Sequence, residues 1–133
     1  MDYTVTVRHS GTMDLTASNG RSEVDLAWGP EPGRWMATEL FLAGLGACML
    51  ATMADYAQSN GLPVEGASVR VGADSAARPA RMSAIHVTYT LPASLSEQQV
   101  QALIRAGNRC KVHNTLENHP EFRVGTAPPA VTA

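Results

Sequence analysis

The sequence has few aromatic residues, almost no excess of charge of either sign, and only two cysteines. Aromatic residues make up 5% of the 133 positions, so we expect a core of aliphatic and small side chains. Ten basic and twelve acidic residues give a net charge of −2, with no basic patch that would attract nucleic-acid phosphates. We therefore expect no nucleic-acid partner. Single domains commonly hold about 100–150 residues, which predicts one domain over residues 1–133.

The N-terminal residues lack the features of a targeting signal. The first ten residues, MDYTVTVRHS, alternate polar and apolar side chains and have neither a basic leader nor the apolar stretch of a signal peptide. We therefore expect a cytoplasmic protein without a membrane partner. Thiols stay reduced in that compartment, so Cys48 and Cys110 are expected to be free, catalytic or transiently bridged.

Period-two alternation predicts a small antiparallel meander at the N-terminus. Apolar and polar residues alternate over 3–8, 12–17 and 21–28, with turn residues between the runs. The stretch WGPEPGRW, residues 28–35, is rich in proline and glycine and predicts a loop. Residues 1–35 are therefore interpreted as a β meander followed by a loop.

The strongest predicted element is a central helix over residues 38–60. Thr38 is a candidate N-cap, Glu39 is an acid in the first turn, and Asn60 begins an Asn-Gly stop. The centre of this helix, residues 40–54, is apolar on nearly every face, yet its 15 residues are too few to cross a bilayer.

A helix that is apolar on all sides needs cover on all sides. A single small subunit can hardly supply that cover, so we expect a homodimer in which a second copy completes it. Four alanines spaced by four, four and three residues form one stripe where another backbone could approach closely: Ala43, Ala47, Ala51 and Ala54.

The C-terminal half predicts a hairpin and then further helices. Residues 64–91 alternate around the polar turn DSAARPAR, which indicates a β hairpin. Ser94 and Glu97 form a candidate capping box at the start of helical segments over 95–116. A final strand is predicted at 121–125, and residues 126–133 are predicted to be a frayed tail.

The two cysteines are the candidate reactive groups. Cys48 lies in the middle of the predicted central helix, and its simplest interpretation is a small core residue, because free cysteine is often buried. A thiol peroxidase needs a thiolate that attacks peroxide and becomes a sulfenic acid, and a second thiol that condenses with it to a disulfide. Cys110 supplies a second thiol, but the sequence alone does not say that the two meet.

Two segments resemble the osmotically inducible protein C and organic hydroperoxide resistance (OsmC/Ohr) family. The stretch TELFLAGLGACMLATMADYAQSNGLPVEGASVRV looks like the central helix of that family and the strand after it. CKVHNTL, residues 110–116, is similar to its C-P-V-H-x-T-L motif, with Lys111 where proline is usual. The resemblance spans about residues 3–125. It implies an α+β fold, with antiparallel sheets around a long buried central helix in an intertwined homodimer.

By this resemblance the protein would be a thiol-dependent peroxidase that acts in oxidative-stress defence. Cys48 would be the peroxidatic cysteine and Cys110 the resolving cysteine. The substrate would be a small organic hydroperoxide or hydrogen peroxide. No bound cofactor is implied, and an external dithiol of the lipoyl or thioredoxin type would reopen the disulfide.

The sequence departs from the family at the groups that would activate the thiol. In the organic-hydroperoxide branch an arginine from an early hairpin is held by a glutamate ten residues before the cysteine, whereas Glu39 lies nine residues before Cys48. At about 100° per residue, a straight helix would place Glu39 opposite Cys48, so Glu39 is either a site residue or only a first-turn acid. Arg8 and Arg34 are candidate cations, although a solvated surface charge is the simpler interpretation of each.

Two alternatives stay open at this stage. His113 follows Cys110 by three residues, but no second pair of ligands completes a zinc site, so His113 is interpreted as a local hydrogen-bonding residue. The missing arginine motif and shifted glutamate also fit a non-catalytic OsmC-like dimer that binds a small apolar ligand or partner.

Overall fold

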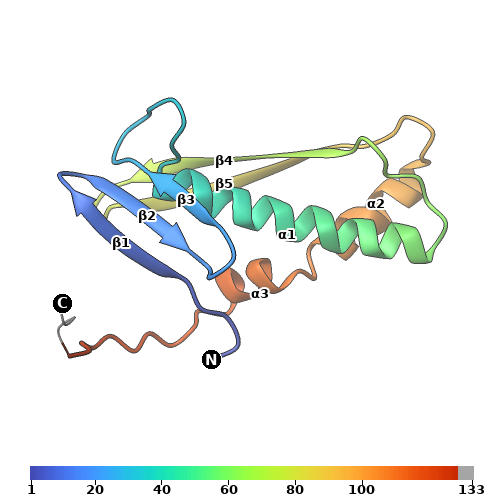
Figure 1. Ribbon diagram of the computed structural model, residues 1–133. Coiled ribbons are helices and arrows are strands. Elements are labelled where there is room, and N and C mark those ends of the chain that lie inside the picture. Colours follow the sequence, from blue (N-terminus) through green and yellow to red (C-terminus); the bar gives the residue numbers. More distant parts are fainter. Residues whose placement is uncertain (129–133) are drawn as a thin grey trace.

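The computed structural model describes residues 1–128 (Figure 1). In chain order the elements are β1 (Thr6–Gly11), β2 (Asp14–Ser18), β3 (Glu23–Leu26), α1 (Ala37–Ser59), β4 (Ser68–Ala76), β5 (Arg81–Thr90), α2 (Glu97–Gly107) and α3 (Lys111–Glu117).

The strands form two separate antiparallel sheets with α1 running beside them. One sheet is the meander β1-β2-β3, and the other is the long hairpin β4-β5. In Figure 1, α1 runs along the hairpin, the meander lies at one end of the molecule, and α2 and α3 lie on the other side of α1. The α+β architecture predicted from the sequence is confirmed.

The core is built along one face of α1. Leu45, Met49, Met53 and Ala57 recur every four residues, and all four are buried. The first pair packs with Cys110 and the strand residues of β4 and β5, and the second pair packs with Leu103 of α2. A four-residue spacing keeps side chains on one side of a helix, so α1 has one packed face and one open face.

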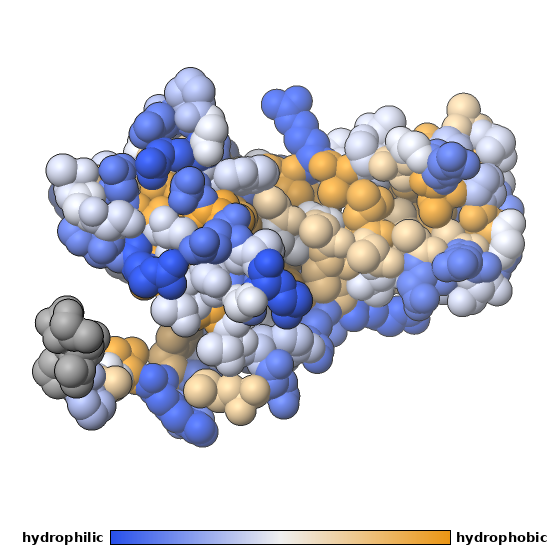
Figure 2. Space-filling model, viewed as in Figure 1, coloured by the Kyte–Doolittle hydropathy of each residue, from blue (hydrophilic) through white to orange (hydrophobic). Residues whose placement is uncertain are grey.

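The open face of α1 is apolar and uncovered in the single chain. Ala47 and Ala51 are exposed, and Phe41 retains 38% of its accessible surface. Figure 2 shows this surface as a band of apolar residues along the helix. By length and composition alone α1 could cross a membrane, but such a test also selects core helices of globular folds. The packed face with its buried methionines indicates a core helix.

Both helices begin at other residues than the sequence predicted. The N-cap of α1 is Met36, not Thr38, and the Glu39 carboxylate accepts the Met36 amide at 2.9 Å. The N-cap of α2 is Ser96, because a turn closed by the Leu95 amide and the Pro92 carbonyl precedes it.

The capping box predicted at Ser94 and Glu97 is therefore wrong by two residues. The box forms instead between Ser96 and Gln99, where each side chain accepts the backbone amide of the other, at 3.2 and 2.8 Å.

The predicted final strand at 121–125 is not formed. Phe122 and Val124 are 83% and 94% exposed, and no strand among residues 1–128 pairs with this segment. A strand without a neighbour leaves its backbone groups to water, so the alternation of EFRV is insufficient by itself. The first strand likewise starts at Thr6 and not at Tyr3. Of the predicted tail, residues 126–128 are irregular and exposed, and 129–133 lie outside the described residues.

Candidate active site around Cys48

The fold brings the two cysteines together. They are 62 positions apart in sequence, with Cys48 in the middle of α1 and Cys110 directly before α3. Because α3 packs against α1, the two side chains meet in one apolar cluster with Leu45 and Met49. Cys110 is 1% exposed, whereas Cys48 is half-buried. Cys48 is therefore the more exposed residue of the pair.

The start of α3 is built around the sulfur of Cys110. This residue has an extended conformation and serves as the N-cap, with its sulfur accepting the His113 amide at 3.2 Å. Its own amide bonds to the Gly107 carbonyl at 3.3 Å, which ties it to the end of α2. The first amides of a helix have no partners inside the helix. Those of Lys111 and Val112 face the sulfur of Cys48.

These contacts hold the pKa of the Cys48 thiol below its ordinary value. Burial by itself would raise that pKa, but the Val112 amide, the Cys110 thiol and the Lys111 amide stabilise the thiolate and outweigh it. The Thr52 hydroxyl lies beside the same sulfur, although its proton goes to the Cys48 carbonyl oxygen at 2.8 Å. We therefore assign the stabilisation to the two amides and the neighbouring thiol.

The pKa of Cys110 shifts in the opposite direction. Burial raises it, and the neighbouring Cys48 raises it further by accepting a hydrogen bond from the Cys110 thiol and by its charge, although the His113 amide opposes this. Tyr89 of β5 also has a raised pKa, because it is buried and lies near Cys110. The two cysteines are thus unequal, with Cys48 the easier to ionise and Cys110 the proton donor.

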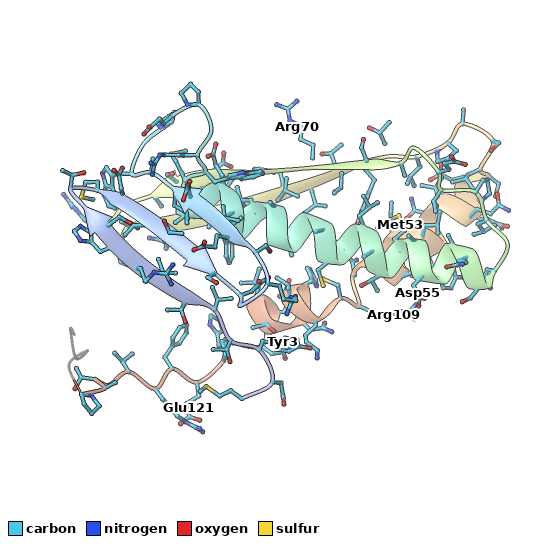
Figure 3. All side chains as sticks on the ribbon, in the orientation of Figure 1. Tyr3, Met53, Asp55, Arg70, Arg109 and Glu121 are labelled. Carbon is cyan, nitrogen blue, oxygen red and sulfur yellow. The ribbon has the colours of Figure 1, made fainter. Side chains whose placement is uncertain are left out.

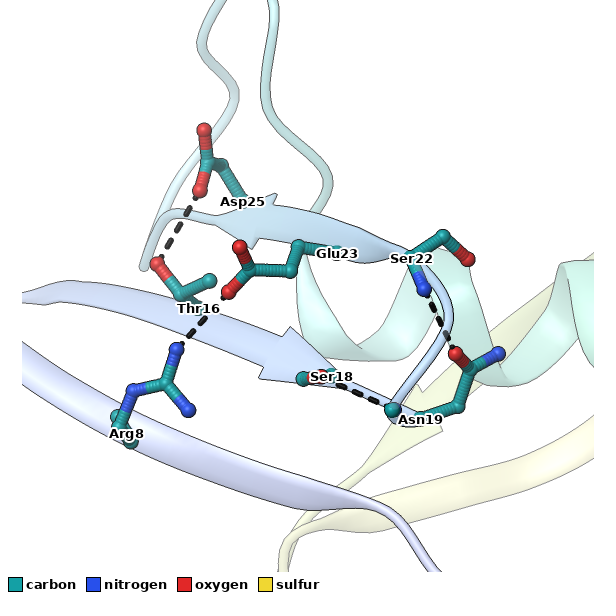
Figure 4. A network of polar contacts seen from close by, with 8 residues as sticks. Arg8, Thr16, Ser18, Asn19, Ser22, Glu23 and Asp25 are labelled. Carbon is teal, nitrogen blue, oxygen red and sulfur yellow. Dashed lines mark hydrogen bonds and ion pairs between the residues drawn. The ribbon is translucent and has the colours of Figure 1, made fainter.

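Arg8 is engaged on the exposed face of the N-terminal sheet. Its guanidinium donates to Glu23 at 2.8 Å across the meander, next to a Thr16–Asp25 hydrogen bond of 3.1 Å (Figure 4). Both members of the Arg8–Glu23 pair are more than half exposed. Within the described chain, none of the contacts of Arg8 reaches Cys48.

Arg34 is held in the loop before α1. It lies 3.5 Å from Asp14 and 3.5 Å from Glu31, and its guanidinium is 3.4 Å from the Leu26 carbonyl. These partners anchor the loop to the N-terminal sheet. The structure therefore does not bring Arg34 to Cys48 among residues 1–128.

Glu39 lies on another side of α1. It caps the helix through Met36 and lines an open pocket of about 380 Å³ with Trp35, Gly46 and Val71. The geometry matches the first-turn interpretation of this residue. Its carboxylate has no recorded contact with Cys48 in the part of the chain described here.

A groove with both apolar and polar walls lies near the cysteine pair. Its volume is about 420 Å³, and it shares Leu45 and Met49 with the cluster that contains the two sulfurs. Ile85 and Val87 of β5 form another wall, and His113 lines it from α3. Asn108 and Glu117 add polar groups, and the groove is large enough for a small molecule.

Residues 1–128 contain no group of three His, Cys, Asp or Glu side chains that could hold a metal ion. His113 lies 3.6 Å from Glu117, one turn later on the same helix. The contribution of the α3 amides was not anticipated from the sequence. The signal for it was the position of Cys110 at a helix start, since a side chain that caps a helix lies beside its free amides.

A family model described as OsmC-like protein matches residues 30–125, well over half of the chain. The chain belongs to the OsmC-like family. No curated protein matches it in sequence.

Solved structures of OsmC-like proteins share its fold. An OsmC-like protein from Mycoplasma pneumoniae superposes with a TM-score of 0.80 at 23% identity, covering 90% of this chain and 91% of the other. An organic hydroperoxide resistance protein OsmC from Legionella pneumophila gives 0.61 at 21% identity over 87% and 90%. The organic hydroperoxide resistance protein OhrB of Bacillus subtilis gives 0.56 at 17% identity over 90% and 93%. These superpositions show that the chain shares their fold.

Proposed function

We propose that this OsmC-like protein is a thiol-dependent peroxidase, with Cys48 as the peroxidatic and Cys110 as the resolving cysteine. The observation that carries the proposal is the contact between the two thiols, with the pKa of the half-buried Cys48 lowered and the pKa of the buried Cys110 raised. A peroxidase of this kind needs that division of roles. Two similar folds belong to proteins described as organic hydroperoxide resistance proteins.

The chemistry proceeds in two oxidative steps. The Cys48 thiolate attacks the distal oxygen of the hydroperoxide, the O–O bond breaks, and the alcohol or water leaves after taking up a proton. The resulting sulfenic acid then reacts with the Cys110 thiol, which forms the disulfide and releases water. The contact between the two residues means that this second step needs little chain movement.

An external dithiol completes the cycle by thiol–disulfide exchange. One of its sulfurs attacks the disulfide, and its second sulfur displaces the protein thiol from the mixed disulfide, so that both cysteines return to thiols and the dithiol is oxidised. The reductant is of the lipoyl or thioredoxin type. The protein itself needs no bound cofactor for this reaction.

We also propose that the active unit is a cytoplasmic homodimer that uses the open face of α1. The candidate membrane-spanning window of this helix is 22% buried in the single chain, although its mean hydropathy is 1.5. An apolar surface of this extent favours burial against another apolar surface. A second copy provides such a surface with the same geometry.

Peroxide consumption by purified protein with dithiothreitol tests the proposed function. Wild-type protein consumes cumene hydroperoxide or hydrogen peroxide, and Cys48→Ser abolishes turnover because the nucleophile is lost. Cys110→Ser reduces peroxide but forms no intramolecular disulfide, which mass spectrometry detects. If wild-type and Cys48→Ser proteins consume peroxide at the same negligible rate, the proposal is wrong.

The second candidate is an OsmC-like dimer that binds a small apolar ligand without turnover. The groove beside Leu45 and Met49 favours it, and so does the lack of a guanidinium contact with Cys48 among residues 1–128. A co-purified apolar molecule, together with a Cys48 thiol that resists alkylation, would distinguish this function from the first.

A further inference from the structure

The two thiols that meet at the start of α3 are a pair of soft donor atoms. Cys48 packs against the cluster that contains the buried Cys110, and both cysteines are free. The sulfur of Cys110 has a fixed place, because it caps α3 and accepts a hydrogen bond from the His113 amide at 3.2 Å. Soft sulfur ligands favour Cu(I), Zn(II) and iron–sulfur clusters. The reduced pair is therefore a candidate ligand set for one of these metals.

The number of available ligands decides which soft metal fits the pair. A structural Zn(II) site takes four protein ligands, a catalytic one takes three, and iron–sulfur clusters are commonly held by four cysteines. The sequence contains only two cysteines, and residues 1–128 contain no group of three His, Cys, Asp or Glu side chains that could hold a metal ion. Cu(I), a closed-shell ion, is stable between two sulfur ligands. Among these metals, the single chain satisfies only Cu(I).

The surroundings of the pair favour a metal ion of low charge that has lost its water. Leu45 and Met49 are buried and pack in the same cluster as the cysteines, so the site is mainly apolar. A buried charge needs a partner or a hydrogen-bond donor. Two thiolates and one Cu(I) ion carry a single negative charge, and the first amides of α3 already face the two sulfurs (Figure 3 shows the surrounding side chains). These amides would stabilise the complex.

We propose that Cys48 and Cys110 together bind one Cu(I) ion in the reduced protein, with one sulfur ligand from each. Each thiol loses its proton to the buffer and forms one S–Cu bond, so two protons are released and no electron is transferred. The half-buried Cys48 meets the ion first, and the buried Cys110 completes the site. The site needs the contact between the two thiols and does not depend on peroxidase activity. Bound Cu(I) occupies both sulfurs and therefore blocks the reaction with peroxide.

Anaerobic titration of the reduced, full-length protein with Cu(I) tests the proposal, with bicinchoninate as the competing chelator. Wild-type protein binds one Cu(I) per chain. Cys48→Ser and Cys110→Ser each bind Cu(I) more than about 100-fold more weakly, since loss of a direct ligand costs more than the roughly 10- to 100-fold loss caused by removing a hydrogen-bond partner of a ligand. Serine at position 110 keeps a side-chain oxygen that can cap α3, so this variant preserves the start of the helix.

Two further measurements do not depend on a substitution. X-ray absorption at the copper edge of the wild-type complex shows two sulfur neighbours. One equivalent of Cu(I) protects Cys48 from iodoacetamide, and protein whose thiols were alkylated beforehand binds Cu(I) no better than the serine variants. Zn(II) is bound more weakly than Cu(I), because the pair leaves it short of ligands.

The proposal is overturned if Cys110→Ser binds Cu(I) as tightly as the wild-type protein, if copper has fewer than two sulfur neighbours, or if the pair prefers Zn(II). The peroxidase proposal can fail separately. A protein that binds Cu(I) through both sulfurs but consumes no peroxide would retain the metal site and lose the enzymatic assignment. A protein that consumes peroxide but binds Cu(I) no better than the serine variants would lose the metal site alone.

Discussion

At the scale of single residues, the two sulfurs have opposite tendencies. The pKa of Cys48 is lowered, mainly because the Val112 amide and the Cys110 thiol overcome its burial, and the pKa of Cys110 is raised by burial and by Cys48. A thiolate reacts with alkylating agents and a thiol does not. The two cysteines should therefore react with an alkylating agent in a measurable order.

We predict that Cys48 is alkylated first, with a midpoint below about 8.5, the ordinary cysteine pKa. Cys110 follows only above that value, because its folded pKa is raised. Because the folded pKa of Cys48 is lowered, Cys48 stabilises the fold above its unfolded pKa, and this stability is lost as the pH falls through the folded value. Because the folded pKa of Cys110 is raised, Cys110 stabilises the fold below its unfolded pKa, and this stability is lost as the pH rises through the folded value. Mass spectrometry of the peptides that contain Cys48 and Cys110 measures the order of alkylation. Earlier alkylation of Cys110 would contradict the prediction.

A second residue-scale prediction concerns Gly107 at the end of α2. A Cβ at this position would lie 2.6 Å from the Tyr89 hydroxyl and 3.3 Å from the Met49 carbonyl oxygen. We expect Gly107→Ala to lower the free energy of unfolding by about 1–3 kcal/mol through overpacking. Chemical denaturation measures the change.

Tyr89→Phe is the matched partner for that substitution. The Tyr89 hydroxyl is buried without a hydrogen-bond partner among the described residues, so its removal costs little or stabilises by up to about 1 kcal/mol. The double variant with Gly107→Ala should recover most of the lost stability, since the 2.6 Å approach disappears. Simple additivity of the two changes would contradict this geometry.

At the scale of elements, α1 and β4 are in close contact at Gly46. A Cβ there would lie 2.9 Å from one methyl of Val71 and 3.3 Å from one of Val69, whereas a Cβ at Gly44 meets nothing within 4 Å. We predict that Gly46→Ala destabilises the fold by about 1–2 kcal/mol. Gly44→Ala, the control on the same helix, stabilises it by up to about 1 kcal/mol through helix propensity. Loss of stability at Gly44 instead would indicate that the second subunit covers it.

The strands were predictable from their alternation, α1 from its long apolar run and end signals, and α2 from its amphipathic period. The ends were not, since a cap depends on the turn before the helix, as at Met36 and Ser96. The strand at 121–125 failed because alternation cannot supply a neighbouring strand.

The candidate site could be predicted only in part. The sequence predicted the two cysteines as candidate site residues, but their contact arises from the packing of α3 on α1, which sequence spacing does not encode. The amides of Lys111 and Val112 were missed because they reach the Cys48 sulfur only once α3 packs against α1.

At the scale of the whole molecule, the open face of α1 predicts how copies associate. We expect a dimer by sedimentation equilibrium, and we expect Ala51→Glu to shift it towards monomer, because a charge in an apolar interface must be desolvated. Ala93→Glu, in the exposed turn before α2, is the control and should leave association unchanged. A wild-type monomer at micromolar concentration would contradict the proposed assembly.

The sulfur of Cys110 has two structural duties, since it closes the first turn of α3 and faces the sulfur of Cys48. We expect a disulfide between Cys110 and Cys48 to weaken the hydrogen bond from the His113 amide to the Cys110 sulfur. The exchange rate of the His113 amide is then expected to differ between the dithiol and disulfide forms of the protein.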